Sequence, residues 1–431
     1  MKKEIKVTLG YKYRIYPTKD QMNILNHQIF IYNQAYNICL NLQQEQWETN
    51  KELSKKDRTY FKASEIDAKV KEALNKRELS FKTVVTQQAR INCDKALKSA
   101  LTVKGRGFPK FKNSKLSKQS FNWNNQGYQI KNSDNKGFKI LRLMSQDIKL
   151  RYHRELPNDC KMNAITISKE NNKYYVSFSI TFNKTVSLIS KDNLDIKKAV
   201  GIDLNINDIA LSNNTLIKTD SKDISKTKYD KKFLRLQRKQ SKRVLKAKRF
   251  KIKLGSNFKK TQNRLNKIYE KSKNKKLDKY NKITSELTNK FDLIVVEDLN
   301  SKIMTKSSKG TLEKHGKNVK QKSGLNKAIL NTSFYQLISQ LDYKTMLNGK
   351  LFVKVPPQYT SKTCSKCGTI NNNLKLSDRI FVCPTCEHTE QRDIQSSHNI
   401  LRLGLESFGL GTSLVDLKHK AFRSTSLEVA S

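Results

Sequence analysis

Residues 364–393 read CSKCGTINNNLKLSDRIFVCPTCEHTEQRD, and this stretch holds two Cys-x-x-Cys pairs that are fifteen residues apart. Each pair can present two thiolates from one tight turn, and two such turns complete a tetrahedral site for Zn²⁺. Because all four ligands are cysteines, no position is left open for substrate, and the ion is expected to be structural. The predicted zinc ligands are Cys364, Cys367, Cys383 and Cys386.

Two hydrophobic stretches lie upstream of the cysteines, and each ends in an acid. The first is Val200-Gly-Ile-Asp203, the second is Leu293-Ile-Val-Val-Glu297, and Asp393 closes the cysteine segment and opens a predicted helix. Neighbouring strands lie about 4.8 Å apart, so these three acids are expected to converge at one sheet edge. Converging carboxylates repel one another without cations, which predicts two Mg²⁺ ions about 3.5–4 Å apart. One ion would activate water, and the other would stabilise a leaving 3′ oxygen.

Two further acids lie close to the predicted site. Asp208 is expected in a turn, and Asp298 follows Glu297 by one residue, so strand alternation should direct it away from the site. The alternative interpretation is that Asp203, Glu297 and Asp393 are three unrelated surface acids.

The chain is strongly basic, with 86 Lys and Arg against 38 Asp and Glu and a formal charge of +48 over 431 residues. Such a surplus indicates a polyanionic partner, and nucleic acid is the first candidate. A membrane surface is the alternative, but the sequence has neither an amphipathic helix with a Trp/Leu face nor a lipidation signal. It also has no signal peptide and no run of about 18 apolar residues.

The remaining cysteines, Cys39, Cys93 and Cys160, are scattered and are predicted to be small core residues in a reducing cytoplasm.

The chain is long enough for two or three domains. Hydrophobic periodicity predicts the following elements: a strand over 5–16, opened into a helix by Pro17 and Asp20; helical structure over 20–104; short strands over 120–182 in a small β-barrel or open sheet; a three-stranded meander over 199–217; a basic helical hairpin over 222–276, or else a disordered basic tail; a strand over 293–297; a helix over Asn326–Leu347; a strand over Leu351–Val355; and a helix over 393–403.

These motifs together resemble TnpB (OrfB), the family of RuvC-type nucleases encoded by insertion sequences and related to the miniature type V CRISPR effectors. The matching segments occur in family order along nearly the whole chain. They are Tyr13-Arg-Ile-Tyr-Pro, Gly107-Phe-Pro-Lys-Phe-Lys, Tyr174-Tyr-Val-Ser-Phe, Gly201-Ile-Asp-Leu, Val295-Val-Glu-Asp-Leu-Asn, the cysteine segment and Arg392-Asp393.

The resemblance implies an α/β multidomain fold, with an RNase H-like (RuvC) nuclease domain that is interrupted by a zinc ribbon and preceded by a β-barrel-like domain carrying a helical insert. The implied domains are 1–18 and 106–190 for the β-barrel-like (wedge) domain, 19–105 for the helical recognition insert, 196–357 and 391–410 for the nuclease domain, 358–390 for the zinc ribbon that loads the target, and 411–431 for a mobile tail.

The resemblance also implies an RNA-guided endonuclease that cuts double-stranded DNA beside a short adjacent motif. Its guide RNA would derive from the end of the transposable element, its catalytic residues would be Asp203, Glu297 and Asp393, and its cofactors would be two Mg²⁺ and one Zn²⁺. The protein would be a prokaryotic cytoplasmic one, found at the nucleoid when on DNA, with a monomer favoured. The residues expected to contact nucleic acid are Tyr60, Gln87, Gln88 and Arg392, and Phe121 and Trp123 either stack on bases or pack in the core.

The sequence departs from the family pattern at three positions. Gln391 replaces an acid, Gln395 stands where the family has Asn, and Asn205 stands where a Gly often follows the first acid; Asn tolerates left-handed backbone. These changes affect the surroundings of the carboxylates and not the predicted metal ligands. Three other functions remain open: a DNA transposase that performs strand transfer, a catalytically idle RNA-guided regulator, and a small CRISPR type V effector.

Overall fold

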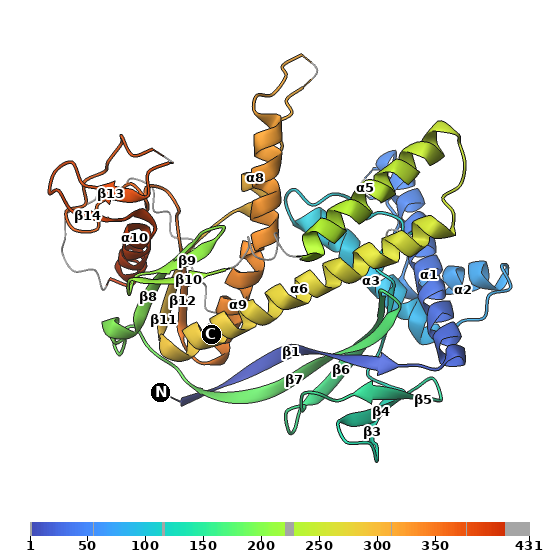
Figure 1. Ribbon diagram of the computed structural model, residues 1–431. Helices are drawn as coiled ribbons and strands as arrows, with labels where there is room; N and C mark the ends of the chain where they lie inside the picture. Colours follow the sequence, from blue (N-terminus) through green and yellow to red (C-terminus); the bar gives the residue numbers. More distant parts are fainter. Residues whose placement is uncertain are drawn as a thin grey trace. The chain divides into compact units, whose positions relative to one another are not determined.

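The computed structural model describes residues 2–54, 56–113, 117–219, 228–311, 313–375 and 377–409 (Figure 1). The chain divides into two compact units, one of which holds Ile5–Lys184 while the other holds the chain from Thr185 onward together with the first residues. The expected tail over 411–431 lies outside the described residues.

A seven-stranded sheet forms the framework of the first unit, with the strand order β2-β6-β7-β1-β5-β4-β3. Strands β2 and β3 are the two ends of this order, and the described residues contain no ladder between them, so the sheet is open rather than a closed barrel. The strands are β1 (Lys2–Tyr16), β2 (Ser120–Trp123), β3 (Tyr128–Asn132), β4 (Phe138–Leu143), β5 (Gln146–Arg151), β6 (Lys161–Glu170) and β7 (Lys173–Ser187).

Three helices follow β1, namely α1 (Lys19–Lys51), α2 (Ala63–Asn75) and α3 (Thr83–Thr102). The cap of α1 is Thr18, whose hydroxyl accepts a hydrogen bond from the Gln21 amide while the Gln21 side chain accepts one from the Thr18 amide. This capping box satisfies two backbone donors that the first helical turn leaves free. The sequence prediction of helical structure over 20–104 therefore holds, but two loops divide it into three helices.

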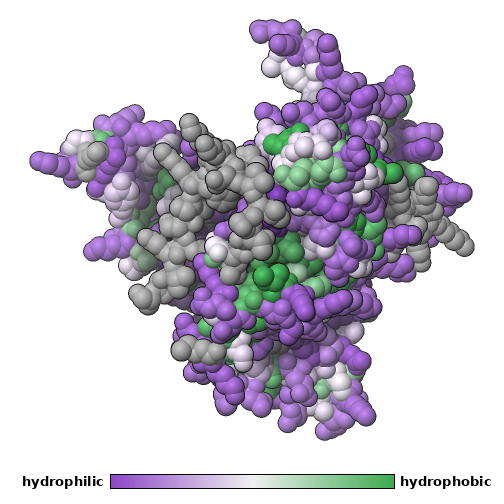
Figure 2. Space-filling model, turned by 90° about the vertical axis from the view of Figure 1, so that its left-hand side faces the viewer, coloured by the Kyte–Doolittle hydropathy of each residue, from purple (hydrophilic) through white to green (hydrophobic). Residues whose placement is uncertain are grey.

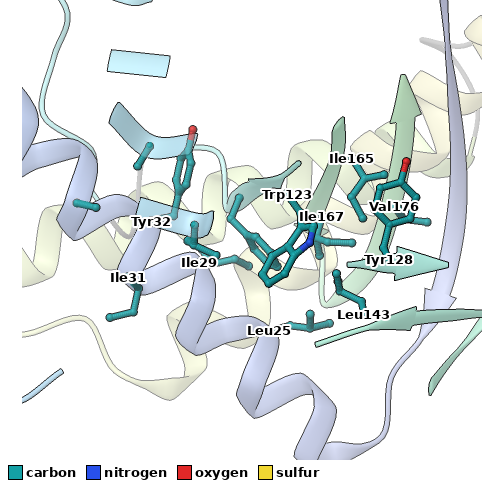
Figure 3. Close-up of a cluster of buried hydrophobic side chains, with 14 of the residues drawn as sticks. Leu25, Ile29, Ile31, Tyr32, Trp123, Tyr128, Leu143, Ile165, Ile167 and Val176 are labelled. Carbon is teal, nitrogen blue, oxygen red and sulfur yellow. The ribbon is translucent and has the colours of Figure 1, made fainter. Parts of the chain in front are cut away.

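The three helices and the sheet share one hydrophobic core (Figure 3). Phe121 is fully buried in it, and Trp123 is buried with its indole nitrogen donating to the Gln126 carbonyl. Both side chains therefore pack in the core, and the alternative that they stack on bases is wrong. Cys39 and Cys93 are buried in the same core and Cys160 packs against it, as predicted.

A five-stranded mixed sheet forms the framework of the second unit, with the order β10-β9-β8-β11-β12. The first three strands form the predicted antiparallel meander, while β11 is parallel to both β8 and β12. The elements before and within this sheet are η1 (Ile196–Lys198), β8 (Ala199–Leu204), β9 (Asp208–Leu211), β10 (Thr215–Lys218), β11 (Leu293–Glu297) and β12 (Leu351–Val355). All residues of β8 and β11 are buried, which is typical of strands covered on both faces.

The helices of this unit include the predicted hairpin, whose first expected residues, 222–227, lie outside the described part of the chain. Its helices are α5 (Lys228–Arg249) and α6 (Ser256–Lys290), and the others are α7 (Ser301–Met304), α8 (Val319–Thr332), α9 (Phe334–Leu347) and α10 (Arg392–Glu406). The prediction of one helix over Asn326–Leu347 is wrong, because Ser333 adopts a left-handed backbone that ends α8 and starts α9. None of the described helices is long and apolar enough to cross a bilayer.

Candidate active site and cysteine cluster

Two of the predicted acids lie at the same edge of the five-stranded sheet. Strands β8 and β11 are parallel, and their register ends with Val296 opposite Ile202. Asp203 and Glu297 are the next residues on the two strands, so both carboxyls leave the sheet at its carboxyl edge. Each residue is only 8% exposed, although each carries a charged group in its ordinary form.

Helix α10 brings the third acid to this edge. Asp393 is the second residue of α10 and is also 8% exposed. The helix lies directly on the sheet because glycines leave room for it: a Cβ on Gly201 of β8 would come within 2.2 Å of the Ser397 carbonyl oxygen, and a Cβ on Gly404 would come within 2.4 Å of the Val295 side chain. The glycine before Asp203 therefore determines how closely Asp393 can approach.

Burial and mutual repulsion show in the acidity of the carboxyls. Burial is the largest cause, and the negative charges of Glu297 and Asp393 are the next, of a rise in the pKa of Asp203 to about 8. Burial also raises the pKa of Glu297. Asp203 and Glu297, whose charged forms are disfavoured in this way, form together with Asp393 a set of oxygen donors suited to a hard divalent cation, since such a cation would compensate the negative charge.

Each of the three carboxyls is held by a neighbouring side chain. The Thr360 hydroxyl donates to Glu297 Oε1 at 2.6 Å, and the Asn205 amide donates to Asp203 Oδ2 at 3.1 Å. The Arg392 guanidinium lies 3.3 Å from Asp393 Oδ1. Thr360 could not be predicted from the sequence, because this contact joins two segments that are far apart in the chain.

The structure corrects the expectations for Asn205 and Asp208. Asn205 does not adopt the left-handed backbone for which Asn is tolerated, and its role is the hydrogen bond to Asp203. Asp208 does not lie in the turn but opens β9, where it pairs with Lys218 of β10. Asp298 is exposed, as strand alternation predicted.

The four predicted zinc ligands form one cluster, with all four Sγ atoms within 4.8 Å of one another. Sγ of Cys364 lies 3.6 Å from that of Cys386, and Sγ of Cys367 lies 3.4 Å from that of Cys383. These separations are far longer than a disulfide bond, and they are close to the roughly 3.8 Å between neighbouring sulfurs of a tetrahedral zinc site with 2.3 Å Zn–S bonds. The cluster could therefore bind zinc.

Cys383 and Cys386 lie in the turn of a small two-stranded hairpin, β13 (Ile380–Val382) and β14 (Thr389–Gln391), that runs directly into α10, whereas Cys364 and Cys367 come from the segment before it. Gly368 follows the first Cys-x-x-Cys pair with a positive φ of 78°, as a tight knuckle requires, and its amide donates to the Cys364 carbonyl. His388 pairs with Glu390 at 3.4 Å, so it is engaged outside the four-cysteine set.

Two buried amides of α10 connect the cluster to the acidic site. The Gln395 amide nitrogen donates to the Thr363 carbonyl at 2.7 Å, while its oxygen accepts from the Ser365 hydroxyl at 2.7 Å. The Asn399 amide nitrogen donates to the carbonyls of Thr360 and Thr363 at 2.8 and 2.6 Å. Gln395 thus stands where the family has Asn. Its hydrogen bonds hold the loop that runs from Thr360, the hydrogen-bond partner of Glu297, to Cys364. Gln391 is exposed and makes no side-chain cap to α10.

The residues predicted to contact nucleic acid fall into two groups. Tyr60 is 73% exposed in the loop before α2, Gln87 is exposed on α3, and Gln88 is half-buried beside it. Arg392 is tied to Asp393 and belongs to the acidic site. Hydrophilic side chains cover most of the face shown in Figure 2, in keeping with the high charge of the chain.

The fold and these two sites define an α/β protein with a group of buried carboxyls, suited to binding a cation, and a four-cysteine cluster. Three family models match this chain. The OrfB_IS605 model, described as a probable transposase, matches residues 183–308; a model described as the helix-turn-helix domain of OrfB_IS605 matches residues 1–52; and a model described as the Cas12f1-like TNB domain matches residues 334–400. Within residues 1–52 the structure has strand β1 (Lys2–Tyr16) followed by helix α1 (Lys19–Lys51).

Curated relatives match in sequence as well. A putative RNA-guided DNA endonuclease InsQ of Escherichia coli K12 is 40% identical over 112 residues, which is 26% of this chain and 28% of the relative. The endodeoxyribonuclease Cas12f1 of Sulfoacidibacillus thermotolerans is 34% identical over 16% of this chain and 17% of the relative. The match thus spans less than a third of either relative. A putative RNA-guided DNA endonuclease of Streptomyces pristinaespiralis is 24% identical over 95% of this chain and 92% of its own length.

Among solved structures, a Cas12f1–sgRNA–target DNA complex aligns with a TM-score of 0.47 and 16% identity, covering 92% of this chain and 98% of that one. In sequence the chain is similar to the OrfB (TnpB) proteins of insertion sequences over residues 1–52 and 183–308, and to Cas12f1-like proteins over residues 334–400.

Proposed function

We propose that this protein is an RNA-guided DNA endonuclease encoded by a transposable element, and that it cuts double-stranded DNA beside a short adjacent motif. The observation that carries the proposal is the convergence of Asp203, Glu297 and Asp393 at one sheet edge, where burial and the charges of the other two acids together raise the pKa of Asp203 to about 8. A site that disfavours its own negative charge is suited to binding divalent cations, and the +48 charge of the chain suits a nucleic-acid substrate.

The strand order supports an RNase H-like (RuvC) assignment for this unit. An antiparallel meander comes first, and two parallel strands follow on the other side of its first strand. The acids lie on the first strand, on the first of the two parallel strands, and on a later helix that packs against both. This is the arrangement that the family resemblance implies for a nuclease with three carboxylates.

The proposed cofactors are two Mg²⁺ in the acidic site and one Zn²⁺ in the cysteine cluster. When bound, Mg²⁺ would neutralise charge at the scissile phosphate and increase the acidity of a coordinated water. The chain's own residues orient the donors: Thr360 holds Glu297, Asn205 holds Asp203, and Arg392 restrains Asp393. The positive charge of the Arg392 guanidinium also lowers the pKa of Asp203, against the larger effects of burial and of the neighbouring acids.

The proposed partners are a guide RNA and a double-stranded target DNA, as the names of the relatives suggest for those proteins. In this scheme base pairing reads the target sequence, while Lys and Arg contacts to phosphates hold the duplex. The first unit, with its exposed Tyr60 and Gln87, is the proposed site of contacts to the adjacent motif.

The decisive experiment is to express the protein with its flanking DNA, sequence the RNA that co-purifies, and challenge the complex with a plasmid library with and without Mg²⁺. We expect a short RNA from the element end and Mg²⁺-dependent double-strand cuts beside one fixed motif. Asp203→Ala and Glu297→Ala should abolish cutting and retain RNA binding, because only the carboxylates are lost. Wild-type cutting by Asp203→Ala, or no bound RNA in the wild type, would contradict the proposal.

A second candidate function is transposition, because the matching model for residues 183–308 is described as a probable transposase. The same carboxyls could serve a strand-transfer reaction. The two functions differ in product: a transposase would covalently join a labelled element end to a target plasmid, whereas the proposed endonuclease would leave only cut ends.

A further inference from the structure

A groove of about 480 Å³ lies between the two helices of the basic hairpin, α5 and α6. Its α5 wall includes Phe233, Gln237, Gln240 and Val244, which recur every three or four residues and therefore share one face of the helix. Its volume lies in the range of small-ligand sites and exceeds that of one nucleobase. The acidic site and the cysteine cluster contribute no residue to its walls.

One end of the groove is aromatic. The rings of Phe233 and Tyr269 meet edge to face, with centroids 4.8 Å apart and planes at 81°. This contact fixes the orientation of the Tyr269 ring, which nevertheless remains 56% exposed. A ring that is held in place and open to solvent offers a surface on which a flat ligand can stack.

The middle of the groove is lined by side-chain amides. The buried Gln240 donates to Gln262 Oε1 at 3.0 Å, and Gln262 in turn donates to Asn266 Oδ1 at 2.9 Å. Gln237 lines the same groove, is exposed, and makes no side-chain hydrogen bond to another described residue. Its amide therefore presents a donor and an acceptor side by side, which is the pattern that pairs with N6 and N7 of adenine.

The surroundings of the groove are cationic. Half of the 22 residues of α5 are Lys or Arg, and α6 carries another eleven. A polynucleotide backbone would be attracted to these charges whatever its sequence. An acidic lipid surface would be attracted to the same charges, but it has no base that could stack on the fixed aromatic ring and pair with the free amide beside it.

We propose that the α5–α6 groove is a binding site for one unpaired adenine of a polynucleotide, with the base stacked on Tyr269 and its N6/N7 edge hydrogen-bonded to the Gln237 amide. Single-stranded RNA and DNA both contain this base. The identity of the strand as guide RNA rests on the proposed function, whereas the preference for adenine does not.

The test uses the full-length protein, purified free of nucleic acid, and fluorescence anisotropy. The probes are a labelled uridine nonamer and the same nonamer with one central adenosine, together with the thymidine nonamer and its dA-containing counterpart. We expect the adenine-containing strand to bind on the order of tenfold more tightly, as one bidentate pair allows. If the gain in affinity from adenine is larger for the ribose probes, the strand is RNA, and if it is larger for the deoxyribose probes, the strand is DNA.

Three variants separate the contacts. Gln237→Leu should remove the adenine preference and leave binding of the uridine nonamer unchanged. Tyr269→Ala should weaken adenine binding roughly tenfold through lost stacking, and Tyr269→Phe should restore it. Tyr335→Ala is the matched control, since Tyr335 is 78% exposed in the same unit and lies outside the groove.

Equal binding of both nonamers by the wild type, or an adenine preference that survives in Gln237→Leu and Tyr269→Ala, would overturn the proposal. Thermal unfolding of each variant verifies that its fold is intact. Plasmid cutting is measured separately, so loss of guided cutting with an intact adenine preference would count against the proposed function and not against this site.

Discussion

The hydroxyl of Thr360 donates a 2.6 Å hydrogen bond to Oε1 of Glu297. Thr360 lies in the loop that leads from β12 to Cys364, and the Asn399 amide of α10 holds its carbonyl. One residue therefore touches a proposed catalytic carboxylate, the helix that carries Asp393, and the chain that enters the cysteine cluster. The acidic site and the cluster are mechanically connected through this loop.

Thr360→Val should slow DNA cutting by roughly 10- to 100-fold, the usual effect of losing a residue that orients a metal-binding carboxylate. The hydrogen bond from Thr360 lowers the pKa of Glu297 against the larger effect of burial, so its loss should raise that pKa further and weaken Mg²⁺ binding. The check is the cutting rate over a Mg²⁺ titration. Thr360→Ser keeps the hydroxyl and should stay near wild type; equal loss in both variants would argue against the hydrogen bond.

With divalent cations chelated, the protein should lose stability as pH rises from about 4 to about 8. The pKa of Asp203 is about 8 in the fold and about 3.9 in an unfolded chain, so the native state binds more protons across this interval and unfolding becomes easier as they are released. The melting temperature in EDTA between pH 5 and 8 measures this. Asp203→Asn cannot ionise, and its melting temperature should depend less steeply on pH; a slope identical to wild type would refute the assignment.

Cys364→Ser should lower the zinc content from about one ion per chain and destabilise the loop held by Gln395 and Asn399. Cutting should therefore fall although no acidic residue has changed. Elemental analysis of zinc together with the cutting rate tests this prediction. Cys160→Ser, at a cysteine far from the cluster in sequence, is the control, and full zinc content in Cys364→Ser would show that Cys364 is not a ligand.

Gly201→Ala should destabilise the second unit by about 1–3 kcal/mol, the usual cost of overpacking a core. The added Cβ would lie 2.2 Å from the Ser397 carbonyl oxygen, so α10 must move away from β8 and take Asp393 with it. The free energy of unfolding measured in urea and the cutting rate should both fall. Gly10→Ala is the matched control, because a Cβ there has no neighbour within 4 Å.

The parts of this site that the sequence predicted are those that follow from regular structure. Asp203 and Glu297 end two buried strands, and the ends of parallel strands meet at one edge, so their convergence was predictable. Thr360 and Asn399 were not predictable, because their contacts join a loop to a helix and leave no periodic signal. The helix boundary at Ser333 was not predicted either. The apolar pattern continues across it, and a serine with a left-handed backbone stands where a glycine would usually mark the end of a helix.

The position of α10 along the chain has a consequence for synthesis. Asp393 is made last of the three acids, nearly half the chain after Asp203, and α10 covers Gly201 only after the cysteine segment has been translated. A ribosome-bound chain that has emerged only as far as β12 holds two of the three acids on an uncovered sheet. If cutting requires all three acids, as proposed, the nascent chain would not cut DNA before residue 393 has been made, and a product truncated before this residue would be inactive.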